Sequence, residues 1–128
     1  MEPTPDQQKK PPLVLLVDDH DTIRQIVRWS LHFDGIQPIE AANGREAVIW
    51  MEQAAREMRF PSVILLDLAM PGMDGHAFLS WLESSWIGRY PTPHVIILTA
   101  ESFLQHALPF PPCVKHIVSK PFQVRELV

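Results

Sequence analysis

Three short, unbroken apolar runs, each ending at a polar residue, constrain the fold of this chain more than any other feature. Uninterrupted runs of this length are typical of strands that are buried on both faces of a parallel sheet. Such strands need helices on both sides of the sheet, so the pattern favours an α/β fold. The runs, with the residues that follow them, are Leu13–Val17 before Asp18 and Asp19, Val63–Leu66 before Asp67, and Val95–Leu98 before Thr99.

Helical patterns separate the runs. Capping residues predict helix starts at Asp21, at Asn43 with Glu46, and at Asp74, and Gly35 is expected to stop the first helix. Apolar residues at helical spacing predict the inward faces, which include Met58 in the second helix and Trp86 in the third. A weak strand at 37–40, a short helix from Glu101 and a last strand at 114–118 complete the pattern. Strand therefore alternates with helix five times, which predicts a doubly wound, five-stranded parallel sheet in a three-layer sandwich.

Length and composition favour one small domain. The chain has 128 residues, of which 46% are hydrophobic and 20% charged. Residues 1–12 are rich in proline and polar residues and are expected to form a flexible tail, so that the folded domain occupies residues 13–128 with a truncated last helix. The net charge of −4 argues against direct binding to nucleic acid. A single cysteine, Cys113, and the lack of a long apolar span predict a cytoplasmic protein without disulfides or membrane contact.

The polar residues that follow the runs predict a phosphoryl-transfer site. With strand order 2-1-3-4-5, the first and third strands are neighbours, and ligands bind at that switch point of an open α/β sheet. Three carboxylates would meet there, and a divalent cation such as Mg²⁺ would offset their repulsion. Asp67 would then be the nucleophile, Thr99 would donate a hydrogen bond to a phosphoryl oxygen, and Lys120 would supply a positive charge.

Four segments, LVLLVDDH, LLDLAMPGMDG, VIILTA and VSKPF, occur in that order, and they resemble the receiver domain of two-component response regulators. The resemblance implies a CheY-like, flavodoxin-like fold with Asp67 as the phosphorylated aspartate. It also implies an Mg²⁺ site, which Mn²⁺ can also occupy, formed by Asp18, Asp19, Asp67 and the backbone carbonyl of Ala69. Thr99 and Lys120 match the remaining catalytic positions.

The resemblance also implies partners and a switch. The phosphoryl donor would be a sensor histidine kinase or a histidine phosphotransfer protein, docking near Ile23, Pro121 and Phe122. Ile117 stands where the family usually has an aromatic switch residue, so its signal is expected to be smaller or differently routed. An effector domain beyond residue 128 and a homodimer through the face of the fourth helix and fifth strand are further expectations of the family.

Two other functions fit parts of the pattern. An aspartyl-phosphate phosphatase would need a general acid two residues after the nucleophile, where Ala69 stands. A receiver-like binding module without phosphorylation would keep only the fold. We therefore expect a phosphoacceptor that catalyses its own phosphorylation and dephosphorylation and is otherwise not an enzyme. His20 follows the acids directly and could approach a partner or the metal, but simple exposure near the site is the expectation.

Overall fold

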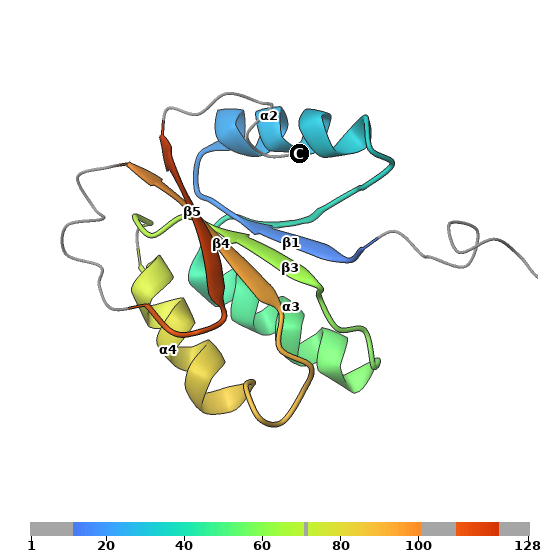
Figure 1. Cartoon of the computed structure of the whole chain (residues 1–128), viewed down its shortest axis with the longest axis vertical. Coiled ribbons are helices and arrows are strands. Elements are labelled where there is room, and N and C mark those ends of the chain that lie inside the picture. Colours follow the sequence, from blue (N-terminus) through green and yellow to red (C-terminus); the bar gives the residue numbers. More distant parts are fainter. Residues whose placement is uncertain (1–11, 71, 101–109, 121–128) are drawn as a thin grey trace, which may run out of the picture.

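A computed structural model describes residues 12–70, 72–100 and 110–120. Five parallel strands form one sheet in the order β2-β1-β3-β4-β5, as predicted (Figure 1). The elements along the chain are β1 (Val14–Val17), α2 (Asp21–His32), β2 (Ile39–Ala41), α3 (Gly44–Arg56), β3 (Val63–Leu66), α4 (Gly75–Ser85), β4 (His94–Ala100) and β5 (Val114–Lys120).

Both faces of the sheet are covered, which explains the unbroken apolar runs. Figure 1 shows α2 on one face and α3 with α4 on the other. Leu15 and Val17 of β1 are buried in the cluster that includes α3 and α4, whereas Val14 and Leu16 are buried in the cluster that includes α2. Successive side chains of a strand point to opposite faces of the sheet. Because both faces are covered here, every side chain of β1 is buried, and the strand shows no alternation of apolar and polar residues.

Local capping chemistry sets most helix ends. The side chain of Asn43 accepts a hydrogen bond from the backbone of Glu46 at 2.9 Å, and Asp74 caps α4 in the same way. Gly35 has a φ of +76° and follows α2 in a Schellman turn, in which Ile36 N–H bonds Leu31 C=O. These three predictions are confirmed.

Two local predictions are wrong. The N-cap of α2 is His20 rather than Asp21, and its side chain makes no capping hydrogen bond. Met58 was expected on the inward face of a longer helix but is 74% exposed. The reason is that α3 ends at Arg56 and Met58 adopts a φ of +56°, which closes a Schellman turn through Arg59 N–H and Ala54 C=O.

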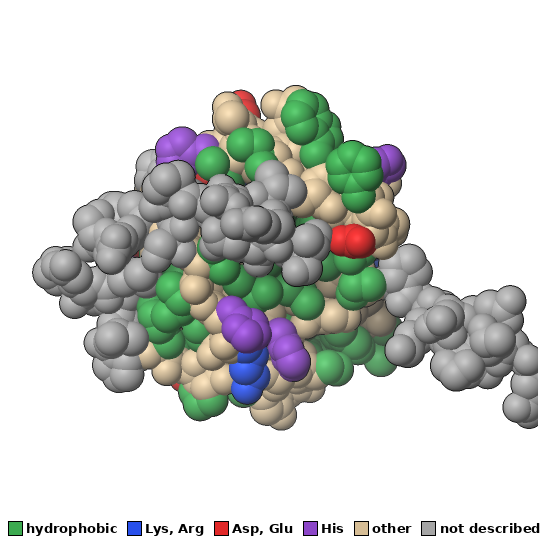
Figure 2. Space-filling model, turned by 45° about the horizontal axis from the view of Figure 1, so that its top comes forward, with side chains coloured by type: hydrophobic (Ala, Val, Ile, Leu, Met, Phe, Trp, Pro, Cys, Tyr) green, Lys and Arg blue, Asp and Glu red, His purple; other side chains and the backbone are tan. Residues whose placement is uncertain are grey.

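Aromatic side chains pack at the end of α4 that lies away from its N-cap. Trp86 is 1% exposed, its ring lies 4.6 Å from that of Tyr90, and its indole donates to the carbonyl of Pro91 at 3.0 Å. Trp29 and Phe33 instead stand out from α2, and Figure 2 shows exposed hydrophobic side chains over that part of the surface.

Some predictions fall on residues that the structure does not describe. These are the tail, the short helix from Glu101 and the final helix. Among the described helices, each is too short or too polar to cross a membrane.

Candidate functional site

The candidate site lies where β1 and β3 end side by side. The two strands pair in parallel with Val17 opposite Leu66, so Asp18 and Asp67 follow at the same edge of the sheet. The backbone N–H of Asp67 donates to Val17 C=O at 2.9 Å, which fixes this end of the pairing. Both carboxylates are buried, with exposed fractions of 0% and 2%.

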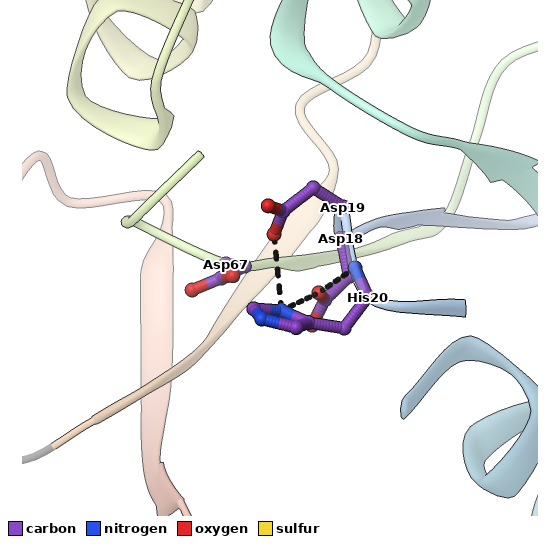
Figure 3. Close-up of side chains that lie close together, drawn as sticks. All are labelled: Asp18, Asp19, His20 and Asp67. Carbon is purple, nitrogen blue, oxygen red and sulfur yellow. Dashed lines mark hydrogen bonds and ion pairs between the residues drawn. The ribbon is translucent and has the colours of Figure 1, made fainter. Parts of the chain in front are cut away.

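Four side chains converge here, as Figure 3 shows: Asp18, Asp19, His20 and Asp67. One ligand atom from each residue lies within 4.8 Å of those from the other three. Two carboxylates about 4 Å apart repel each other by about 4 kcal/mol at an effective dielectric constant near 20. A cluster of this charge density favours a bound divalent cation.

Short local hydrogen bonds orient the two buried carboxylates. Asp18 Oδ1 accepts from the backbone N–H of His20 at 2.9 Å, and Asp67 Oδ1 accepts from that of Ala69 at 3.1 Å. Both are bonds from a side chain to the backbone two residues later, which aspartate forms readily in turns. Each loop therefore fixes its own acid after the strand ends.

Arg24 ties α2 to this edge of the sheet. Its guanidinium bonds the backbone carbonyl of Asp18 and the carboxylate of Asp21, and its Nε lies 3.4 Å from Glu40 on β2. Arg28 contacts the same Glu40 at 2.7 Å. Arg24 thus holds the loop that carries the acidic pair, and both arginines tie α2 to Glu40 of β2.

The donor set fits a hard divalent cation. Asp19 Oδ1 is buried and makes no hydrogen bond to any part of the chain that the structure describes. His20 Nδ1 is 3.1 Å away from it, but the pair is not aligned for a hydrogen bond. A buried carboxylate oxygen without a donor is costly unless a cation satisfies it. Carboxylate oxygens are the ligands that Mg²⁺ and Mn²⁺ favour.

A family match decides what kind of chain carries this site. The sequence model of the family described as "Response regulator receiver domain" matches residues 14–128. This chain belongs to that family. The phosphoacceptor function fits the family, and the expectation of a receiver domain is confirmed.

The curated relatives are longer regulators, and this chain matches only part of each. The DNA-binding transcriptional regulator NtrC of Salmonella typhimurium is 34% identical over 117 residues, which cover 91% of this chain and 23% of NtrC. The transcriptional regulatory protein TrcR of Mycobacterium tuberculosis is 28% identical over 115 residues, which cover 90% of this chain and 42% of TrcR. The chain thus spans less than half the length of either regulator.

Solved receiver domains have the same fold. A CheY-like receiver domain from Methanospirillum hungatei is 26% identical with a TM-score of 0.69, and the match covers 89% of this chain and 86% of that one. The BeF3-activated receiver domain of NtrC is 33% identical with a TM-score of 0.68, and the match covers 92% of this chain and 89% of that one.

The remaining predicted catalytic, switch and docking residues lie on β4, on β5, on α2 or outside the described residues. Thr99 is fully buried near the end of β4, and its hydroxyl has no hydrogen-bond partner within the described ranges. Lys120 ends β5 and pairs through its backbone with Ala100. Ile117 is 43% exposed on β5, and Ile23, which is part of α2, is partly buried against the hydrophobic cluster on that face of the sheet. Pro121 and Phe122 lie outside the described residues.

Sequence reasoning missed two residues that shape the receiver site. A Cβ on Gly75 would lie 2.5 Å from both the Asp67 carbonyl oxygen and Leu68 Cα, so only glycine allows α4 to start this close to β3. Arg24 was also missed, although an arginine three residues after Asp21 on a helix is a usable sign of a local ion pair.

Proposed function

We propose that Asp67 accepts a phosphoryl group from a phosphohistidine partner, with a divalent cation held by Asp18, Asp19, Asp67 and the backbone carbonyl of Ala69. The observation that supports this most directly is the convergence of the acidic side chains within 4.8 Å at the ends of β1 and β3. Bound Mg²⁺ would neutralise the cluster and the incoming phosphoryl oxygens.

The chemistry of the proposal is one displacement at phosphorus. A carboxylate oxygen of Asp67 forms the new bond to phosphorus, while the bond from phosphorus to the donor nitrogen breaks and leaves its electron pair on the imidazole. The buried hydroxyl of Thr99 would donate to a phosphoryl oxygen, which would give it the partner that it lacks among the described residues. Lys120 would contribute a positive charge at the same edge.

Partners follow from this chemistry. We propose a sensor histidine kinase or a phosphotransfer protein as donor, docking near Ile23, Pro121 and Phe122, with Ile117 in the responsive surface. A cytoplasmic location and an effector domain attached to the receiver belong to the same proposal, since NtrC is named as a DNA-binding regulator. Autophosphorylation and self-hydrolysis would be its only catalysis. A phosphatase remains disfavoured, because Ala69 cannot transfer a proton from the position where that reaction needs an acid.

The test is labelling of the purified chain with radioactive acetyl phosphate and Mg²⁺. We expect label that is stable to acid but labile to base in the unaltered chain, and no such label in Asp67→Asn. Chelation of Mg²⁺ should also abolish labelling of the unaltered chain. Asp34→Asn is the matched control, because Asp34 is an exposed acid in the turn after α2. Equal labelling of the Asp67→Asn variant and the unaltered chain would refute the assignment.

A further inference from the structure

His20 is exposed to solvent and yet turns one ring nitrogen toward the acids. It is 62% exposed, and its Nδ1 lies 3.2 Å from Asp18 Oδ1 and 3.1 Å from Asp19 Oδ1 (Figure 3). The sequence pointed to simple exposure, which accounts for the open side of the ring but not for the direction of Nδ1. The backbone contributes to this direction, because His20 N–H bonds Asp18 Oδ1 and places the ring beside the cluster.

The spacing of these atoms is that of neighbouring ligands around one ion. Two ligand atoms at right angles, each about 2.1 Å from a divalent cation, are about 3.0 Å apart. The two observed distances of 3.1 Å and 3.2 Å are close to that value. Ligand atoms on opposite sides of such an ion are about 4.2 Å apart, and the whole cluster lies within 4.8 Å. Small side-chain adjustments would therefore bring the imidazole and the carboxylates onto one ion.

His20 Nδ1 is within hydrogen-bond distance of Asp18 Oδ1 at 3.2 Å, and it can act as a ligand once a bound ion replaces that contact. The nearby guanidinium of Arg24 is engaged by Asp21, Glu40 and the backbone carbonyl of Asp18. With the exposed side of the ring toward water, Nε2 can carry the proton and Nδ1 can offer its lone pair.

We propose that His20 Nδ1 is a ligand of the divalent-cation site and shifts its preference toward borderline transition metals such as Ni²⁺ and Co²⁺. This rests on the metal site of the proposed function and adds a nitrogen to its oxygen ligands. Imidazole nitrogen suits Ni²⁺, Co²⁺ and Zn²⁺, whereas Mg²⁺ favours oxygen ligands and keeps several waters. His20 is then a specificity-determining residue for the ion that the site accepts.

The decisive measurement compares Ni²⁺ and Mg²⁺ binding by calorimetry in the full chain and in His20→Ala. We expect His20→Ala to weaken Ni²⁺ binding by about tenfold or more, with a much smaller change for Mg²⁺. His32→Ala is the matched control, since His32 is an exposed histidine at the other end of α2. Asp19→Asn measures the Ni²⁺ bound elsewhere by other histidines, and that background is subtracted.

Pulsed EPR of the Mn²⁺-loaded chain gives a second readout, and its deciding result comes from the unaltered chain. A directly bound imidazole produces a nitrogen coupling, which we expect in the unaltered chain and in His32→Ala but not in His20→Ala. Absence of that coupling from the unaltered chain overturns the proposal.

Two calorimetric results would also overturn it. One is an equal change in Ni²⁺ and Mg²⁺ affinity on His20→Ala, or no change in either. The other is tighter Mg²⁺ binding with unchanged Ni²⁺ binding, which would make the ring a competitor of the ion. Mg²⁺-dependent labelling of the unaltered chain is measured in the same preparation, so failure of the phosphoacceptor function is seen separately from failure of nitrogen ligation.

Discussion

Replacing Gly75 by alanine tests whether the start of α4 positions the proposed phosphoacceptor. The new Cβ would lie 2.5 Å from the Asp67 carbonyl oxygen and from Leu68 Cα. That is about 1 Å short of the ordinary carbon–carbon contact distance of about 3.5 Å. Both neighbours are backbone atoms, so either the first turn of α4 or the end of β3 must move.

The size of the effect follows from two opposing terms. Overpacking of this kind costs about 1–3 kcal/mol. Alanine is favoured over glycine in a helix by at most about 1 kcal/mol. We therefore expect the free energy of unfolding of Gly75→Ala to fall by about 1–2 kcal/mol, with Tm about 5 °C lower. Because misplacement of a reacting group by about 1 Å can cost about 100-fold in rate, labelling by acetyl phosphate should slow by about 10- to 100-fold.

Gly44→Ala is the matched control for this prediction. Gly44 is likewise the first residue of its helix, and its added Cβ would lie 2.6 Å from the carbonyl oxygen of Met73. It should lower stability by a similar amount but slow labelling much less, since it does not press on Asp67. Urea unfolding followed by tryptophan emission, together with labelling rates, checks both variants. A Gly75→Ala chain that is as stable and as quickly labelled as the unaltered one would refute the reasoning.

Two further predictions concern residues around the site and in the core. Arg24→Ala should lower the free energy of unfolding by about 1–3 kcal/mol, because Arg24 is mostly buried and bonds the Asp18 carbonyl and Glu40; urea unfolding measures it, and an unchanged midpoint would contradict it. Burial raises the pKa of the Cys113 thiol above its ordinary 9.0, and Glu83 adds to this. Iodoacetamide should therefore alkylate Cys113 about tenfold or more slowly at neutral pH than in urea. Fast alkylation of the folded chain would refute the burial effect. Since the folded chain keeps the thiol proton to a higher pH than the unfolded chain does, the free energy of unfolding should decline as the pH rises above about 9.

The fold could be predicted because its strands are buried on both faces. Continuous apolar runs such as Leu13–Val17 are typical of parallel strands that are covered on both faces. Because the carboxyl ends of parallel strands lie at the same edge of the sheet, the acids that follow neighbouring strands meet there. Capping was also readable, since Asn43 and Asp74 need only neighbours a few residues away in the sequence. The strand at 37–40 was displaced to Ile39–Ala41, because its apolar pattern is short and gives no clear register.

What the sequence did not show depends on contacts between distant segments or on side-chain torsions. Gly75 is indistinguishable from an ordinary first helical residue until α4 is placed against β3. The direction of the His20 ring depends on the turn after β1 and on the position of Asp19. Met58 ended outside because a backbone turn with positive φ closed α3 early, and methionine gives no signal for such a turn.

The position of the tryptophans limits what their emission can report. Trp86 caps the C-terminal end of α4, and an 11-residue helix is about 16 Å long, whereas the acids lie at the N-terminal end. Trp29 stands on the solvent side of α2, and Trp50 on α3 and Trp81 on α4 pack partly buried against the core. Indole emission from Trp86 should therefore follow loss of the packed core faithfully, yet stay silent when an ion or a phosphoryl group arrives. A flat fluorescence titration with Mg²⁺ would leave occupancy of the acidic cluster undetermined, and calorimetry or a probe placed beside the acids is the appropriate choice.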